Sequence, residues 1–216
     1  MNTKLYKILL IMLALIVSNC SKKLEEPDVL YKKAIHEAYK GNFESATKYL
    51  DDIDENYPYT EYSNNTTVLL AYSNYKQKKY SEVVGIVDFF IKTNPKNEFV
   101  PYLFYIKALS FYDQIKNYKK DKQILYDFLE IEKIMTENFK NSIYTKDLKA
   151  KADFVVAMVI AGELDVAIQY QRKNHCIASV NRYLEVLPIA DEKNLELLKH
   201  NAKICLEKLG IKNYNL

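Results

Sequence analysis

Two stretches of this chain, "GNFESATKYLDDIDENYP" (residues 41–58) and "KKYSEVVGIVDFFIKTNP" (residues 78–95), align without a gap. Residues of the same class recur 37 positions apart: Phe43, Ala46, Leu50, Ile53 and Pro58 match Tyr80, Val83, Val87, Phe90 and Pro95. The same step leads from Ala34 to Ala71 and then to Ala108. Residues at i, i+3, i+7 and i+10 share one helix face, and a proline ends each unit because it cannot continue a helix. The sequence therefore predicts repeated amphipathic helices.

This pattern resembles the tetratricopeptide repeat, a helical hairpin of about 34 residues. The chain has only 4 glycines and 5 prolines, and no Val/Ile/Thr alternation that would indicate strands. Asn42 and Ser81 lie where helix N-caps are expected. We predict an all-α solenoid of about four to five such repeats.

The later repeats are less regular. A third hairpin is predicted from helices at residues 101–118 and 121–137. A long helix starts near Thr145, with Gly162 as a candidate interruption, and a helix at residues 175–187 pairs with it. Asp191 caps a last helix, which Gly210 closes.

The N-terminus has the pattern of a lipoprotein signal. Ten apolar residues (8–17) follow Lys4 and Lys7, too few to span a membrane but typical of a secretory signal. Cys20 then follows in a segment that resembles the bacterial lipobox, although Asn19 replaces the usual Gly or Ala. We predict a signal peptide at 1–19, a lipidated linker at 20–27, and acyl chains on Cys20 as the anchor. The alternative is an ordinary signal with an incidental cysteine. By the sorting rule of such lipoproteins, Ser21 indicates the outer membrane.

Composition excludes some partners. The chain has 31 basic and 28 acidic residues, so electrostatics give no reason to expect nucleic-acid binding. Beyond Cys20, only Cys176 and Cys205 remain. A disulfide between them is compatible with an oxidising compartment, but both lie among apolar residues on predicted helices, where a free cysteine acts as a small hydrophobe.

Six of the 19 tyrosines are predicted to line one groove. In such arrays the first helix of each hairpin faces the concave side. The tyrosines at these positions are Tyr31, Tyr72, Tyr75, Tyr102, Tyr105 and Tyr112. A rigid ring ending in a hydroxyl suits peptide capture. The alternative is that the rings simply pack between hairpins.

Enzymatic chemistry is not indicated. The chain contains no HExxH, paired CxxC, phosphate-binding glycine loop or nucleophile elbow. His175 and Cys176 are adjacent, so on a helix they point apart. We therefore predict a binding protein, not an enzyme, with no metal and no cofactor apart from the lipid on Cys20.

Several segments together resemble the BamD (ComL) family of outer-membrane β-barrel assembly lipoproteins. They are the lipobox-like Cys20, "GNFESA" (41–46), "YPYTEYS" (57–63), "FFIKTNP" (89–95) and "SVNRYLEVL" (179–187). The resemblance implies a lipid-anchored periplasmic scaffold on the outer membrane. Its N-terminal repeats, 28–137, would receive signals of unfolded barrel proteins. Its C-terminal repeats, 138–216, would dock the last periplasmic domain of the barrel-forming subunit, and other assembly lipoproteins are further candidate partners.

Asn181 and Arg182, in the "VNR" match, are where the family places the contact to the barrel subunit. Arg182 is one of only two arginines in a lysine-rich chain, which is consistent with a need for a bidentate donor. The alternative is that this arginine persists by chance.

A tetratricopeptide lipoprotein has other uses. It could act as a pilot for a secretin or coordinate envelope constriction. A peptidoglycan hydrolase would need a pair of carboxylates in a cleft, which the sequence does not reveal. Compared with the family, the linker at 115–121 is shorter, and the last repeat lacks its second helix.

Overall fold

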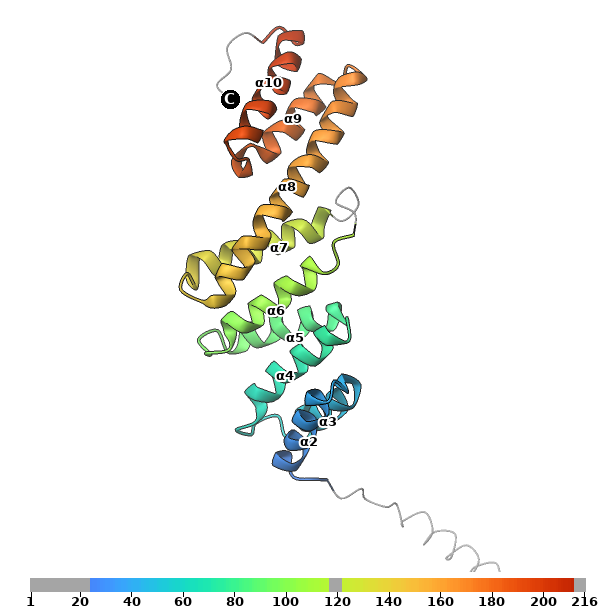
Figure 1. Cartoon of the computed structure of the whole chain (residues 1–216), viewed down its shortest axis with the longest axis vertical. Coiled ribbons are helices and arrows are strands. Elements are labelled where there is room, and N and C mark those ends of the chain that lie inside the picture. Colours follow the sequence, from blue (N-terminus) through green and yellow to red (C-terminus); the bar gives the residue numbers. More distant parts are fainter. Residues whose placement is uncertain (1–23, 117–121, 212–216) are drawn as a thin grey trace, which may run out of the picture.

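Helices form most of the chain that the computed structural model describes, which is residues 24–116 and 122–211. These residues contain nine α-helices and one short 3-10 helix (Figure 1). They are α2 (Pro27–Tyr39), α3 (Phe43–Asn56), α4 (Ser63–Lys76), α5 (Tyr80–Thr93), α6 (Val100–Tyr112), α7 (Lys122–Asn138), α8 (Ile143–Arg172), α9 (Cys176–Val186), η1 (Leu187–Ile189) and α10 (Glu192–Lys208).

The helices stack as successive hairpins into an elongated solenoid, with α2 at one end and α10 at the other (Figure 1). Each helix packs on the next along the chain, and α4 also contacts α6, which contacts α8. The first helices of neighbouring hairpins therefore meet along one side. Four hairpins and the additional helix α10 confirm the predicted all-α tetratricopeptide-like solenoid.

The residues that recur every 37 positions are the ones that form the core. Ala34, Ala71 and Ala108 are completely buried at equivalent places on α2, α4 and α6. The matched positions of α3 and α5 are buried as well: Ala46, Leu50 and Ile53, and Val83, Val87 and Phe90. The small alanines let neighbouring helices approach, and the larger side chains fill the space between hairpins.

Four helices end in the same turn. Gly41, Lys78, Asn174 and Gly210 all have positive φ, between 59° and 83°. After α2, the Gly41 amide donates to the Ala38 carbonyl and the next amide reaches Glu37. This pair of bonds is a Schellman motif, and it recurs at the other three positions. Lys78 is the counterpart of Gly41, 37 residues on, and adopts a conformation that suits glycine better.

Some predicted helix ends were wrong. The N-cap of α5 is Lys79, not Ser81, because the turn at Lys78 starts the helix earlier. Asn42 is the N-cap of α3, but its side chain does not cap the helix; it donates to Glu37 instead. Helix α6 ends at Tyr112, because the chain turns there and Ile115 packs back on the core. Asp191 does cap α10, and its carboxylate accepts the Asn194 amide.

Helix α8 is not interrupted at Gly162. Glycine inside a helix costs about 1 kcal/mol relative to alanine, and packing offsets that cost here. The first part of α8 packs on α6 and α7, and the later part packs on α9. Gly162 itself is buried, with Leu125 and Tyr126 of α7 beside it.

The C-terminal half has a continuous core. One buried cluster extends from Ala108 on α6 to Ala202 on α10, so it crosses the boundary expected between residues 137 and 138. Cys176 and Cys205 lie in a smaller cluster between α9 and α10 as free, buried thiols. They act here as small apolar residues rather than as a disulfide, and burial raises the pKa of the Cys205 thiol.

Candidate partner-binding surfaces

The six predicted groove tyrosines, which we call the tyrosine surface, are all partly buried. Three of them, Tyr31, Tyr72 and Tyr102, line one open pocket of about 250 Å³ together with Asn65, Val68 and Leu69. These three come from α2, α4 and α6, so the stacking of first helices assembles the pocket. Its walls are aromatic and aliphatic, and one amide provides a hydrogen-bonding group. Such a pocket can take an apolar side chain of a peptide.

Two other tyrosines connect hairpins. The Tyr75 hydroxyl donates to Asp113 at 2.6 Å, and the Tyr105 hydroxyl donates to Asp147 at 2.9 Å. Burial and these carboxylates raise the pKa of both phenols, to about 12 for Tyr105. Their hydroxyls are therefore occupied within the chain, as the packing alternative expects.

The last tyrosine of the set lies apart from the pocket. Tyr112 packs against Phe128 of α7, with ring centroids 5.6 Å apart, and Lys151 lies over its ring. Tyr144, which the sequence analysis did not single out, contacts both Tyr102 and Tyr105 at centroid distances of 5.4 and 5.0 Å. The structure thus brings three predicted tyrosines around one pocket and uses the other three in packing.

Arg182 belongs to a group of four charged residues that we call the arginine cluster: Lys122 on α7, Glu163 on α8, and Arg182 and Glu185 on α9. Arg182 Nη1 lies 2.9 Å from Glu185 Oε2 and 3.4 Å from Glu163 Oε2. Lys122 Nζ pairs with the other oxygen of Glu163. The cluster therefore ties three helices together and has no net charge.

Burial differs sharply within the arginine cluster. Glu163 is only 1% exposed, whereas the side chains of Arg182 and Glu185 are 37% and 42% exposed. A buried carboxylate is expensive unless it is paired, and Glu163 has two cations. Partial burial opposes the charge on Arg182, but attraction to Glu163 and Glu185 outweighs it and raises the pKa of the guanidinium.

Asn181 lies outside the arginine cluster, although it precedes Arg182 directly in α9. Neighbouring helix residues point about 100° apart, and Asn181 borders an open pocket of about 560 Å³ near the C-terminal ends of α8 and α10. Ile177 and Leu209 line the same pocket and are both exposed. The two predicted contact residues thus lie on adjoining but different faces of α9.

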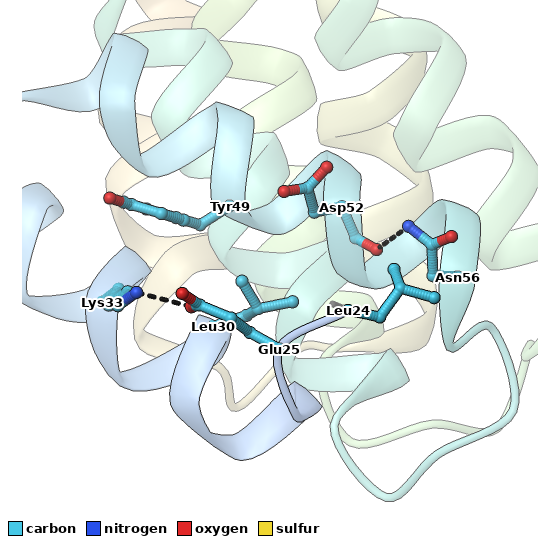
Figure 2. Close-up of a pocket in the computed structure, with 7 residues that line it drawn as sticks. All are labelled: Leu24, Glu25, Leu30, Lys33, Tyr49, Asp52 and Asn56. Carbon is cyan, nitrogen blue, oxygen red and sulfur yellow. Dashed lines mark hydrogen bonds and ion pairs between the residues drawn. The ribbon is translucent and has the colours of Figure 1, made fainter. Parts of the chain in front are cut away.

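A third pocket, of about 510 Å³, lies where the described chain begins. Figure 2 shows Glu25 and Lys33 pointing toward one another, with Tyr49 and Asp52 of α3 on the facing wall. The Tyr57 hydroxyl also donates to the Glu25 carbonyl. These contacts fasten the first residues after the linker to the first hairpin. Cys20 itself lies outside the described residues.

The described part of the chain offers few other sites. No helix in it is both long enough and apolar enough to cross a membrane, and no group of three His, Cys, Asp or Glu side chains there could hold a metal ion. His175 is exposed while Cys176 is buried, so this adjacent pair does not form a nucleophile and base.

Sequence reasoning missed Glu163 and its partner Lys122. The available signal was a carboxylate directly after the apolar stretch "VVAMVIAG" (155–162). A lone acidic residue on a buried helix face calls for a cationic partner, but nothing in the sequence indicates that Lys122 and Arg182 supply it. The acceptors Asp113 and Asp147 were missed for the same reason.

The chain is similar to a known protein family and to several named proteins. Residues 24–201 match the model of the YfiO family, described as "Outer membrane lipoprotein". Three relatives are each called "Outer membrane protein assembly factor BamD". The Caulobacter vibrioides protein is 24% identical, over 82% of this chain and 61% of its own length. The Rickettsia prowazekii protein is 27% identical, over 86% and 76%, and the Haemophilus influenzae protein is 25% identical, over 85% and 76%.

The family match covers well over half of the chain and includes all helices from α2 to α9 and most of α10. It also includes both Arg182 and the pocket of the tyrosine surface. This chain therefore belongs to the YfiO family of outer membrane lipoproteins.

Proposed function

We propose that this protein is a lipid-anchored scaffold that helps to assemble β-barrel proteins in the outer membrane. The observation that carries the proposal is the match of residues 24–201 to the YfiO family, whose relatives are named as assembly factors. The match spans 61% of the C. vibrioides protein. The names do not favour the alternative roles of secretin pilot or constriction coordinator.

In this proposal, acyl chains on Cys20 hold the protein on the periplasmic face of the outer membrane. The contacts of Glu25 with Lys33 and Tyr57 support this arrangement, because they hold the chain against the first hairpin five residues after Cys20. The protein acts by binding, without a cofactor other than this lipid and without a catalytic step.

The two ends of the solenoid have different partners. The pocket of Tyr31, Tyr72 and Tyr102 receives an apolar side chain from the signal of an unfolded barrel protein. The opposite end docks the last periplasmic domain of the barrel-forming subunit through Asn181 and Arg182, and other assembly lipoproteins bind elsewhere. The partly exposed side chain of Arg182 and the apolar pocket beside Asn181 support such a contact.

Calorimetry tests the proposal directly. The acyl-free mature chain is mixed with the last periplasmic domain of the barrel-forming subunit from the same organism, and Arg182→Ala is measured beside it. Truncating a hydrogen-bonded partner of a buried charge pair costs about 2–5 kcal/mol of affinity, which is about thirtyfold or more. Absence of binding by the unchanged chain would contradict the docking role, whereas binding that survives Arg182→Ala would remove only the role of this arginine.

A further inference from the structure

Among the described residues, the guanidinium of Arg182 forms hydrogen bonds through one nitrogen only, although the arginine cluster has two carboxylates. Its two carboxylates both contact Nη1 of Arg182. The Nε and Nη2 donors of the guanidinium form no hydrogen bond with the residues that the structure describes. A guanidinium has a planar fork of donors that matches a carboxylate with two parallel bonds, so one edge of Arg182 remains for an outside ligand.

The two carboxylates differ in how firmly they are held. Glu163 is nearly inaccessible to solvent, and its other oxygen is bound by Lys122 from a different helix. Glu185 is well exposed and lies one helical turn from Arg182 on α9; its other contact is a 3.4 Å bond from Tyr126. Glu163 is thus a fixed point in the fold, while Glu185 is a surface side chain that can move away.

Because Lys122 also pairs with Glu163, Arg182 is able to bind a second carboxylate from outside the chain. A buried carboxylate with a single cation would be left unpaired if that cation turned to a new ligand, which is strongly unfavourable. Glu163 has a second cation in Lys122. Arg182 can therefore bind a further carboxylate without leaving the buried charge of Glu163 uncompensated.

We propose that Glu163 is a positioning residue: it holds Arg182 through Nη1 so that the Nε–Nη2 edge binds a carboxylate of the partner protein. Glu185, on the same Nη1, weakens this binding because its negative charge repels the incoming carboxylate. The inference rests on the proposed docking function. It assigns opposite effects to two glutamates that contact the same guanidinium nitrogen.

The test compares Glu163→Gln with Glu185→Gln in the acyl-free mature chain, titrated with the same periplasmic domain. Both changes remove one negative charge, so attraction over a distance to an acidic partner strengthens equally in both. Glu207→Gln, at an exposed site on α10, measures that general effect. We expect Glu163→Gln to weaken binding about tenfold, since hydrogen bonds to charged groups are worth about 1.5–3 kcal/mol. We expect Glu185→Gln to strengthen it about two- to fivefold beyond the control, the range for an exposed ion pair.

A double variant separates positioning from general damage to the fold. If Glu163 acts through Arg182, Glu163→Gln has no further effect on affinity in a chain that already has Arg182→Ala. Equal weakening in both backgrounds would overturn the proposal, as would a Glu163→Gln chain that binds like Glu207→Gln. Thermal unfolding shows whether each variant folds.

If Glu163→Gln does not fold, Glu185→Gln decides: weaker binding than the control would overturn the inference. If the unchanged chain does not bind at all, the docking function fails and the inference falls with it. Binding by the unchanged chain together with the wrong pattern among the variants overturns only the role of Glu163.

Discussion

The tyrosine surface and the arginine cluster are built in different ways. The tyrosine surface repeats: Tyr31, Tyr72 and Tyr102 come from the first helices of three successive hairpins and meet around one pocket. The arginine cluster occurs once, and it joins residues up to 63 positions apart in the sequence, from Lys122 to Glu185. The first is neutral and mainly apolar, while the second depends on compensated charge.

This difference shows what a repeat pattern can and cannot indicate. A 37-residue period implies which residues share the inner side of the solenoid, because every hairpin repeats the same geometry. It says nothing about a charge pair that only one hairpin contains. It also implies different responses to mutation. Successive substitutions at the tyrosine surface should each lower the stability by a small, additive amount, whereas removing both cations of the arginine cluster should lower it by more than the sum of the two.

The largest effect is expected when both cations of the arginine cluster are removed. Lys122→Ala with Arg182→Ala leaves Glu163 buried and unpaired, which typically costs about 3–5 kcal/mol of stability. Each single change leaves Glu163 one cation, so we expect the double variant to lose more than the sum of the two. Urea unfolding of the four chains measures this. Small, additive losses of stability would mean that water solvates the charge of Glu163. The arginine cluster would then respond to mutation like the tyrosine surface.

At the tyrosine surface the corresponding losses should be smaller and additive. Tyr75→Phe and Tyr105→Phe each remove one hydrogen bond to a carboxylate. We expect each to cost about 1.5 kcal/mol, the lower end for a bond to a charged group, because both phenols are only partly buried. Tyr102→Phe is the matched control, because the Tyr102 hydroxyl has no hydrogen bond with the described residues. Coupling between the two substitutions well above 0.5 kcal/mol in the same unfolding assay would contradict a region of independent ties.

Alkaline pH should weaken the tyrosine surface more than the arginine cluster. Burial raises the pKa of Tyr102 and Tyr105 to about 12, whereas the unfolded chain releases these protons near pH 10. Their contribution to stability is therefore complete below pH 10 and is lost as the pH rises toward 12. Burial likewise raises the pKa of Tyr126, beside Glu185, to about 12, but this is a single residue.

Denaturation midpoints between pH 9 and 12 test this expectation. The midpoint should fall less steeply with pH in the double variant Tyr102→Phe, Tyr105→Phe than in the unchanged chain. Tyr126→Phe should alter this slope less than the double variant does. An unchanged slope in the double variant would show that these phenols titrate normally in the folded protein.

The smallest effect concerns the turns that close α4 and α8. Lys78 and Asn174 occupy the same left-handed position of a Schellman turn, but asparagine tolerates this conformation better than lysine does. We expect Lys78→Gly to stabilise the protein by about 0.5–1 kcal/mol and Asn174→Gly to change it by only a few tenths. Equal shifts in thermal unfolding for the two would contradict a strained turn at Lys78 alone.

Much of the fold followed from local pattern. The match of Ala34, Ala71 and Ala108 predicted three equivalent buried positions, and all three are completely buried. Both ends of α10 were also predicted, because Asp191 at its start and Gly210 after its end act through bonds within a few residues of themselves. The turn at Lys78 was not, since lysine rarely adopts positive φ and only the stacking of α4 and α5 requires it.

The pattern of residues along the chain was enough to predict a helical-hairpin solenoid with tyrosines on the first helices, because the period of apolar residues and the helix-ending residues act locally. The packing of the helices determines which tyrosines meet around a pocket, that α8 continues through Gly162, and that Glu163 lies between Lys122 and Arg182. Those outcomes depend on how separate helices cross. Side chains that are distant in the chain meet there under conditions of burial and charge that no local pattern encodes.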